Sequence, residues 1–124
     1  MTNKELYDSL GLSEKAKEAI DQAKEQKIDT LYTRIAGREY IYRPITRKEW
    51  RTLRERMAAR TKEAEDNPEI LALIKEEELE SLVELARVYY ENNDTMYAGV
   101  IDTLSDAILL SSGFGGVEFD PVRL

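Results

Sequence analysis

The sequence contains no cysteine and no histidine among its 124 residues. Without cysteine there is no disulfide, no thiolate metal site and no cysteine nucleophile. Without histidine the chain lacks the commonest general base and transition-metal ligand, and it has no Ser–His catalytic pair. The oxygen-ligand spacing of a calcium loop and the glycine-rich loops that bind phosphate are also missing. These absences predict a protein that is not an enzyme and that binds no cofactor or metal.

Long hydrophobic runs are missing as well. No apolar stretch approaches the roughly 18 residues of a membrane span. The first residues lack the charged-then-apolar layout of a secretory signal. A content of 42% hydrophobic and 35% charged residues is typical of a helix-rich globular domain. We therefore expect a single soluble domain located in the cytoplasm.

The chain begins with two short helical patterns. Thr2 is placed to cap a turn that runs to Leu10, and Gly11 stops it. Ser13 is placed to cap a second helix, which has acidic residues early and Lys24 late, as the helix dipole prefers. The apolar stripe of this second helix is thin and consists mostly of alanine. We therefore expect it to pack at the periphery or to become ordered on a partner.

A β-hairpin is predicted next. Two β-rich runs, Thr30–Ile35 and Arg38–Ile45, flank Ala36-Gly37, which suits a tight turn. Alternation places Tyr40 and Tyr42 on the same face of the second strand. A hairpin alone is marginal in water, so this one must pack on the helices or on another chain.

Three helical patterns follow the hairpin. Thr46 and Glu49 form a capping box for a helix that runs to about Glu65. Pro68 suits the first position of the next helix, which we expect to continue to about Glu91. Asp94 is placed to cap the last helix, whose stripe includes Tyr97, Val100, Ile101, Leu104, Ala107 and Ile108, and Gly113 is placed to stop it.

These elements predict a mainly α fold of the α+β class, with about four helices and one β-hairpin near residues 30–45. The expected organisation has three parts. Residues 1–27 form a peripheral helical segment, residues 28–114 form the helical domain with its hairpin, and residues 115–124 form an extended tail.

Charge is divided unevenly along the chain. The net charge is −7, yet the span from Arg38 to Lys62 carries nine basic residues and three acidic ones. Residues 63–94 carry eleven acids against two bases. We favour adjacent helices of opposite sign that satisfy each other. An Arg-rich nucleic-acid surface on residues 47–62 is the weaker alternative, and charge pairing between copies in an oligomer stays open.

Two segments resemble a known family. Residues 37–57, GREYIYRPITRKEWRTLRERM, and residues 98–114, AGVIDTLSDAILLSSGF, are similar to small tail-assembly proteins of long-tailed bacteriophages. That group includes tail assembly chaperones and the related baseplate-assembly proteins of contractile-tailed phages. The resemblance is carried by Tyr42, Arg43, Pro44, Thr46, Glu49, Gly99, Leu104, Ile108, Ser112, Gly113 and Phe114. It implies a non-catalytic protein that binds other tail or baseplate proteins.

The sequence and the resemblance together predict a phage tail or baseplate assembly factor that shields other tail proteins in the host cytoplasm. The candidate partner-binding residues are apolar or aromatic: Phe114, Val117, Phe119, Val122, Leu124, Tyr40 and Tyr42. A structural subunit of the tail, baseplate or neck that stays in the virion is the first alternative, and a small nucleic-acid-binding regulator is the second. We expect no membrane association, we consider nucleic acid the less favoured partner, and we slightly favour a self-associated form.

Overall fold

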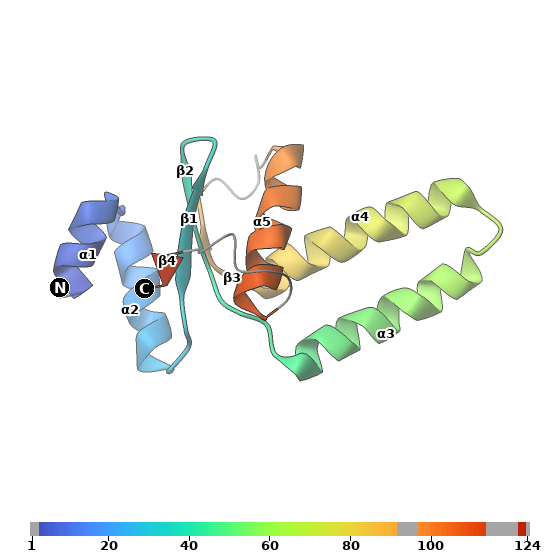
Figure 1. Ribbon diagram of the computed structural model, residues 1–124, viewed down its shortest axis with the longest axis horizontal. Helices are drawn as coiled ribbons and strands as arrows, with labels where there is room; N and C mark the ends of the chain where they lie inside the picture. The colour runs from blue at the N-terminus through green and yellow to red at the C-terminus, as the bar shows by residue number, and fades with distance from the viewer. Residues whose placement is uncertain (1–2, 92–96, 114–121, 124) are drawn as a thin grey trace.

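A computed structural model describes residues 3–91, 97–113 and 122–123 of the chain. A central antiparallel sheet separates two layers of helices, and one pair of helices extends beyond the sheet (Figure 1). The elements in chain order are α1 (Asn3–Leu10), α2 (Glu14–Glu25), β1 (Leu31–Ile35), β2 (Arg38–Tyr42), α3 (Arg47–Glu63), α4 (Pro68–Leu85), β3 (Arg87–Tyr90), α5 (Ala98–Ser111) and β4 (Val122–Arg123). The mainly α fold of the α+β class is confirmed.

The predicted hairpin is the centre of the sheet. β1 and β2 pair in the expected register, with Ile35 opposite Arg38. Ala36 and Gly37 both have positive φ angles, 52° and 77°, as a two-residue type I′ turn requires. The strand order is β3-β2-β1-β4, so further strands lie on both sides of the hairpin. The hairpin is therefore supported within the chain, as its marginal stability in isolation requires.

The third strand corrects one sequence prediction. The helix that we expected to reach Glu91 ends at Leu85, and residues 87–90 form β3 against β2. Val88, Tyr89 and Tyr90 are β-branched or aromatic and favour a strand when an edge is available. Tyr40 and Tyr90 face each other edge to face, with ring centroids 5.7 Å apart.

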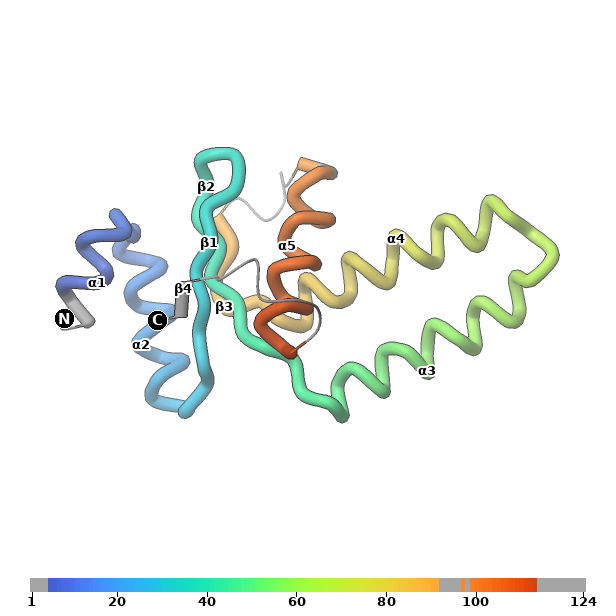
Figure 2. The backbone as a smooth tube through the Cα atoms, viewed as in Figure 1, coloured from blue at the N-terminus to red at the C-terminus, as the bar shows by residue number. Residues whose placement is uncertain are grey.

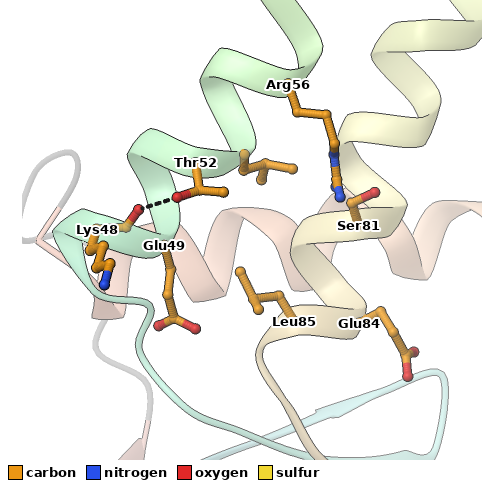
Figure 3. A pocket seen from close by; sticks show the side chains of 8 residues that line it. Lys48, Glu49, Thr52, Arg56, Ser81, Glu84 and Leu85 are labelled. Carbon is orange, nitrogen blue, oxygen red and sulfur yellow. Dashed lines mark hydrogen bonds between the residues drawn. The ribbon is translucent and has the colours of Figure 1, made fainter.

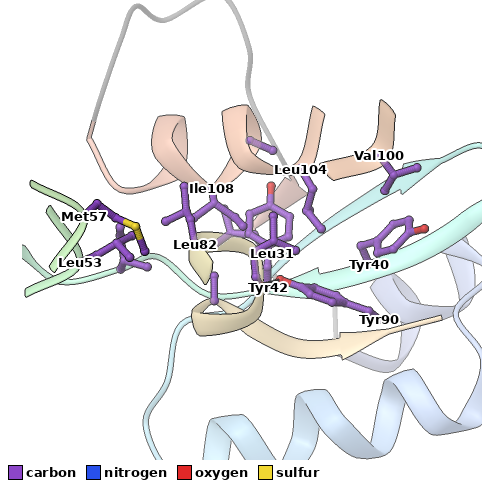
Figure 4. Close-up of a cluster of buried hydrophobic side chains, with 14 of the residues drawn as sticks. Leu31, Tyr40, Tyr42, Leu53, Met57, Leu82, Tyr90, Val100, Leu104 and Ile108 are labelled. Carbon is purple, nitrogen blue, oxygen red and sulfur yellow. Dashed lines mark hydrogen bonds between the residues drawn. The ribbon is translucent and has the colours of Figure 1, made fainter. Parts of the chain in front are cut away.

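The first face of the sheet is covered by α5 and the adjoining end of α4. Figure 4 shows Val100, Leu104 and Ile108 of α5 beside the sheet tyrosines. Leu104 and Ile108 are fully buried, as their spacing predicts. Tyr97 differs, because it is 61% exposed and stands just before the helix rather than within its buried stripe. The prediction that Asp94 caps this helix was wrong, because α5 begins at Ala98 with Tyr97 as its N-cap. Asp94 itself lies outside the described residues.

The second face of the sheet is covered by α1 and α2. Ala16 and Ile20 of α2 are fully buried against Tyr32 and Ile41. The expectation that a thin stripe would leave α2 loosely packed was therefore wrong, because α2 is held against the sheet of its own chain. Small alanine side chains let the helix approach the sheet closely, so a thin stripe is enough to cover it.

Local capping signals are confirmed where the structure describes them. The Ser13 hydroxyl accepts from the Ala16 N–H, and Thr46 and Glu49 form the complete capping box of α3. Pro68 occupies the first turn of α4. Gly113 follows α5 with a φ of 100°, a value that favours glycine. The predicted cap Thr2 lies outside the described residues.

Candidate functional site

The predicted binding tail is mostly outside the described residues. Phe114, Val117, Phe119 and Leu124 all lie there. Val122 belongs to β4, whose backbone pairs with Tyr32 of β1. This pairing brings the end of the chain to the edge of the sheet, but it does not test partner binding by the tail.

Tyr40 and Tyr42 are not available as a contact surface. Both side chains are 0% exposed and belong to the core under α5. Burial raises the pKa of Tyr42 to about 12, because ionisation in an apolar environment is unfavourable. The prediction that these two tyrosines contact a partner was therefore wrong. Alternation correctly placed the two rings on one face, but that face points into the protein.

The most exposed structural unit is the pair α3 and α4, which we call the arm. The two helices run antiparallel and project away from the sheet, so that their connection lies at the far end of the molecule from α1 (Figure 2). Helices of 17 and 18 residues are each about 25 Å long. The helices contact each other along one seam, which contains Leu53, Met57 and Ile74.

A charged joint holds the arm to the sheet. The Arg43 guanidinium donates two hydrogen bonds to the Glu49 carboxylate, at 2.9 and 2.6 Å. These bonds, together with that from the Thr46 backbone N–H, lower the pKa of Glu49 to about 2. The Ile45 N–H donates to the Ser112 hydroxyl at 2.9 Å, which ties the start of the arm to the end of α5.

Opposite charges pair across the seam of the arm. Arg54 contacts Glu78 at 2.8 Å, and Arg60 forms an ion pair with Glu77. The Arg60 pair lowers the pKa of Glu77. The prediction that the basic and acidic helices lie side by side and satisfy each other is confirmed for these two pairs.

One side of the arm is hollowed near its base. A groove of about 680 Å³ runs between α3 and α4 (Figure 3). Leu53 and Leu85 supply its apolar surface, while Lys48, Arg56 and Glu84 supply charge around it. Such a lining suits an apolar segment with charged neighbours, which is the usual composition of a protein contact.

Apolar side chains are also exposed toward the tip of the arm. Ile70 is 43% exposed and Leu73 is 56% exposed, three positions apart on α4. Ile70 lines a second hollow with Arg60 and Ile74. Ile70 and Leu73 were not among the contact residues predicted from the sequence. The start of α4 is apolar around more than one face, so its sequence pattern does not show which of these residues stay exposed.

Two kinds of site are not found in the described part of the chain. No group of three or more acidic side chains there is arranged to hold a metal ion. None of the helices in those ranges is long and apolar enough to cross a membrane.

Comparison with known proteins gives no relative: no family model, no curated protein and no solved structure matches this chain. The candidate site therefore rests on its own geometry. It consists of the groove at the base of the arm together with Ile70 and Leu73 near the tip.

Proposed function

We propose that this chain is a non-enzymatic assembly factor that binds other protein chains, of the phage tail or baseplate type that its sequence resembles. The observation that carries the proposal is the arm. It projects beyond the sheet, contains a groove with leucines in its lining, and exposes Ile70 and Leu73. Grouped apolar side chains on a projecting element are typical of protein contact sites.

The mechanism is shielding. The arm covers an apolar segment of a client tail protein, while the acidic surface of the chain keeps the complex in solution in the host cytoplasm. Helix-in-groove contacts of this kind use a few apolar anchors, with charged residues at the rim. The tail with Phe114, Val117 and Phe119 is the second proposed contact, since the apolar residues after Phe114 lie beyond the segments that carry the resemblance.

The charge arrangement favours a protein client over nucleic acid. Two arginines of the Arg-rich helix, Arg54 and Arg60, are engaged with carboxylates of α4. Glu76 and Glu80 on the neighbouring helix add negative charge that would repel the phosphates of DNA or RNA.

The test is co-expression with the tail proteins of the same phage. We expect the full-length chain to keep at least one of them soluble and to co-purify with it. A Leu73→Glu variant should lose most of that effect, and a chain truncated after Ser112 tests the tail separately. Ala58→Glu is the matched control, because Ala58 is exposed on the other side of the arm. Unchanged solubility and recovery of every tail protein with both the Leu73 variant and the truncated chain would remove the shielding mechanism.

The alternative to an assembly factor is a structural subunit of the tail, baseplate or neck that stays in the virion. Mass spectrometry of purified particles separates the two roles. An assembly factor should be absent or far below the amount of the known tail subunits, whereas a structural subunit should be present in a fixed ratio to them.

A further inference from the structure

We propose that the groove side of the arm binds a second copy of this chain, so that two arms form a four-helix bundle. The proposal goes beyond the proposed function, because the second copy occupies the same surface when no client is bound. In the bundle the arms run in the same direction, and a two-fold axis parallel to them relates the copies. Each α3 then lies against the α4 of the other copy.

The groove side is a continuous stripe on both helices. On α4 it carries Ile70, Ile74, Glu77, Ser81 and Glu84, at spacings of four, three, four and three residues. On α3 it carries Glu49, Leu53, Arg56, Arg60 and Glu63, at spacings of four, three, four and three residues. A stripe with this period lies on one side of a helix along its whole length.

The body of the protein leaves this side open. α5 packs against α4 through the shared core that includes Val83 and Ala86. Figure 3 looks onto the groove side, and there α5 lies behind α3 and α4. Two helices that pack along one seam can pack a second layer of helices on their open side. In a four-helix bundle this second layer is another pair of helices.

Charge selects both the partner and the orientation. At the base of the groove α3 presents Lys48 and Arg56, and α4 presents Glu84, which is also within reach of Arg87. The other charges of the two stripes are mostly paired within the chain, Arg60 with Glu77 and Glu49 with Arg43. A two-fold axis along the arms places the basic stripe of each copy against the acidic stripe of the other. An axis across the arms would instead place basic on basic and acidic on acidic. The attractive arrangement is therefore the parallel one.

The available area fits a reversible dimer. A face two helices wide and about 25 Å long covers on the order of 500 Å² per copy. Two copies would then bury roughly 1,000 Å², which is at the lower limit for a specific interface. The exposed Ile70 and Leu73 of both copies would lie at the same end of the bundle, where they add apolar contact. We expect dissociation constants in the micromolar range, on the order of 1–100 μM.

The experiment is sedimentation velocity on the full chain from about 1 to 100 μM, with two charge variants. The first, Lys48→Glu with Arg56→Glu, makes both stripes acidic. The second, Ser81→Lys with Glu84→Lys, makes both stripes basic. Each variant alone should associate at least about tenfold more weakly than the wild type. An equimolar mixture of the two should regain dimers, because each acidic stripe then meets a basic one.

The matched control is Arg47→Glu with Arg51→Glu. It makes the same change in net charge on the same helix, but these positions continue the stripe of Arg54 and Ala58 on the other side. It should dimerise like the wild type, and circular dichroism should show that all variants are folded.

A wild type that stays monomeric at 100 μM would overturn the proposal, as would a control that loses association as strongly as the first variant. A mixture of the two variants that stays monomeric would also overturn it. If the wild type is monomeric and still recovers tail proteins, the dimer fails and the proposed function stands. If the wild type dimerises but recovers no tail protein, the dimer stands and the proposed function fails.

Discussion

The body and the arm of this protein bury their side chains in different ways. In the body, both faces of the sheet are covered, so that Tyr40, Ile41 and Tyr42 are all fully buried in consecutive positions. In the arm, the buried side chains lie along the seam between α3 and α4 and at the base of α4 against α5, and the helices expose their other sides. The body therefore holds most of the fully buried side chains, while the arm exposes the outer sides of its helices.

The difference shows how one small chain can combine a stable core with a binding element. Three-layer packing needs no outside partner. A two-helix arm has a narrow core, because α3 packs mainly against α4, and α4 gains a second neighbour, α5, at the base of the arm. Under the proposed function, the free sides of the arm bind other chains without disturbing the sheet.

A core truncation in the body should cost the most. Leu104→Ala removes a fully buried side chain above the sheet and should lower the free energy of unfolding by about 3 kcal/mol. Leu71→Ala in the arm removes a half-buried side chain and should cost about 1 kcal/mol. Urea denaturation of both variants measures the difference. Equal losses would contradict the division between body and arm.

The joint between the two regions should come next. Glu49→Gln weakens the bonds to Arg43 and the capping box, and should cost about 2 kcal/mol at neutral pH. Because the folded-state pKa of Glu49 is lowered to about 2, its contribution is present above its usual pKa of about 4.5 and is lost as the pH falls toward 2.

The stability gap between wild type and Glu49→Gln should therefore narrow between about pH 4.5 and pH 2. Denaturation curves at several pH values measure this gap. Glu55→Gln on the exposed side of α3 is the control and should stay close to the wild type. A stability difference between wild type and Glu49→Gln that stays constant across this pH range would show that the Arg43 contact does not cause it.

Two tyrosines of the body should respond differently to loss of their hydroxyl. The Tyr90 hydroxyl donates to the Val83 carbonyl at 2.5 Å, so Tyr90→Phe should cost about 1 kcal/mol. The Tyr42 hydroxyl is buried and has no hydrogen-bond partner within the described ranges. Tyr42→Phe should therefore stay within about 0.5 kcal/mol of the wild type or be more stable. The reverse order in thermal denaturation would contradict this assignment.

The smallest effect on folding is expected at the exposed arm residues. Leu73→Glu should change the stability of the dilute protein by less than about 0.5 kcal/mol, because this side chain is 56% exposed. The same variant should weaken binding of the client. In the arm, a substitution can therefore reduce binding without reducing the free energy of unfolding. A large loss of stability at low protein concentration would show that Leu73 belongs to the core.

Local signals predicted the parts of the fold that depend on neighbouring residues. The turn at Ala36-Gly37, the cap at Ser13 and the capping box at Thr46 are all confirmed. Each depends on backbone angles and hydrogen bonds within a few residues, which the sequence shows directly. The faces of the central strands also followed from alternation.

The candidate site was less accessible to sequence reasoning. Tyr40 and Tyr42 were proposed as contacts because their side chains suit an interface, but α5 covers them. Ile70 and Leu73 were missed because a helix with apolar residues on several sides does not reveal which side a neighbour will cover. The strand at residues 87–90 was missed for a related reason, since an edge of β2 had to be available to it.

The sequence by itself determined where α2, α3 and α4 begin, where the hairpin turns, and that basic and acidic charge occupy different helices. Only the tertiary structure decided which apolar faces are covered. It buried the tyrosines under α5, turned residues 87–90 into a strand, and left the sides of the arm away from its seam exposed. The physical reason is that backbone conformation depends on nearby residues, whereas burial depends on contacts between elements far apart in the chain.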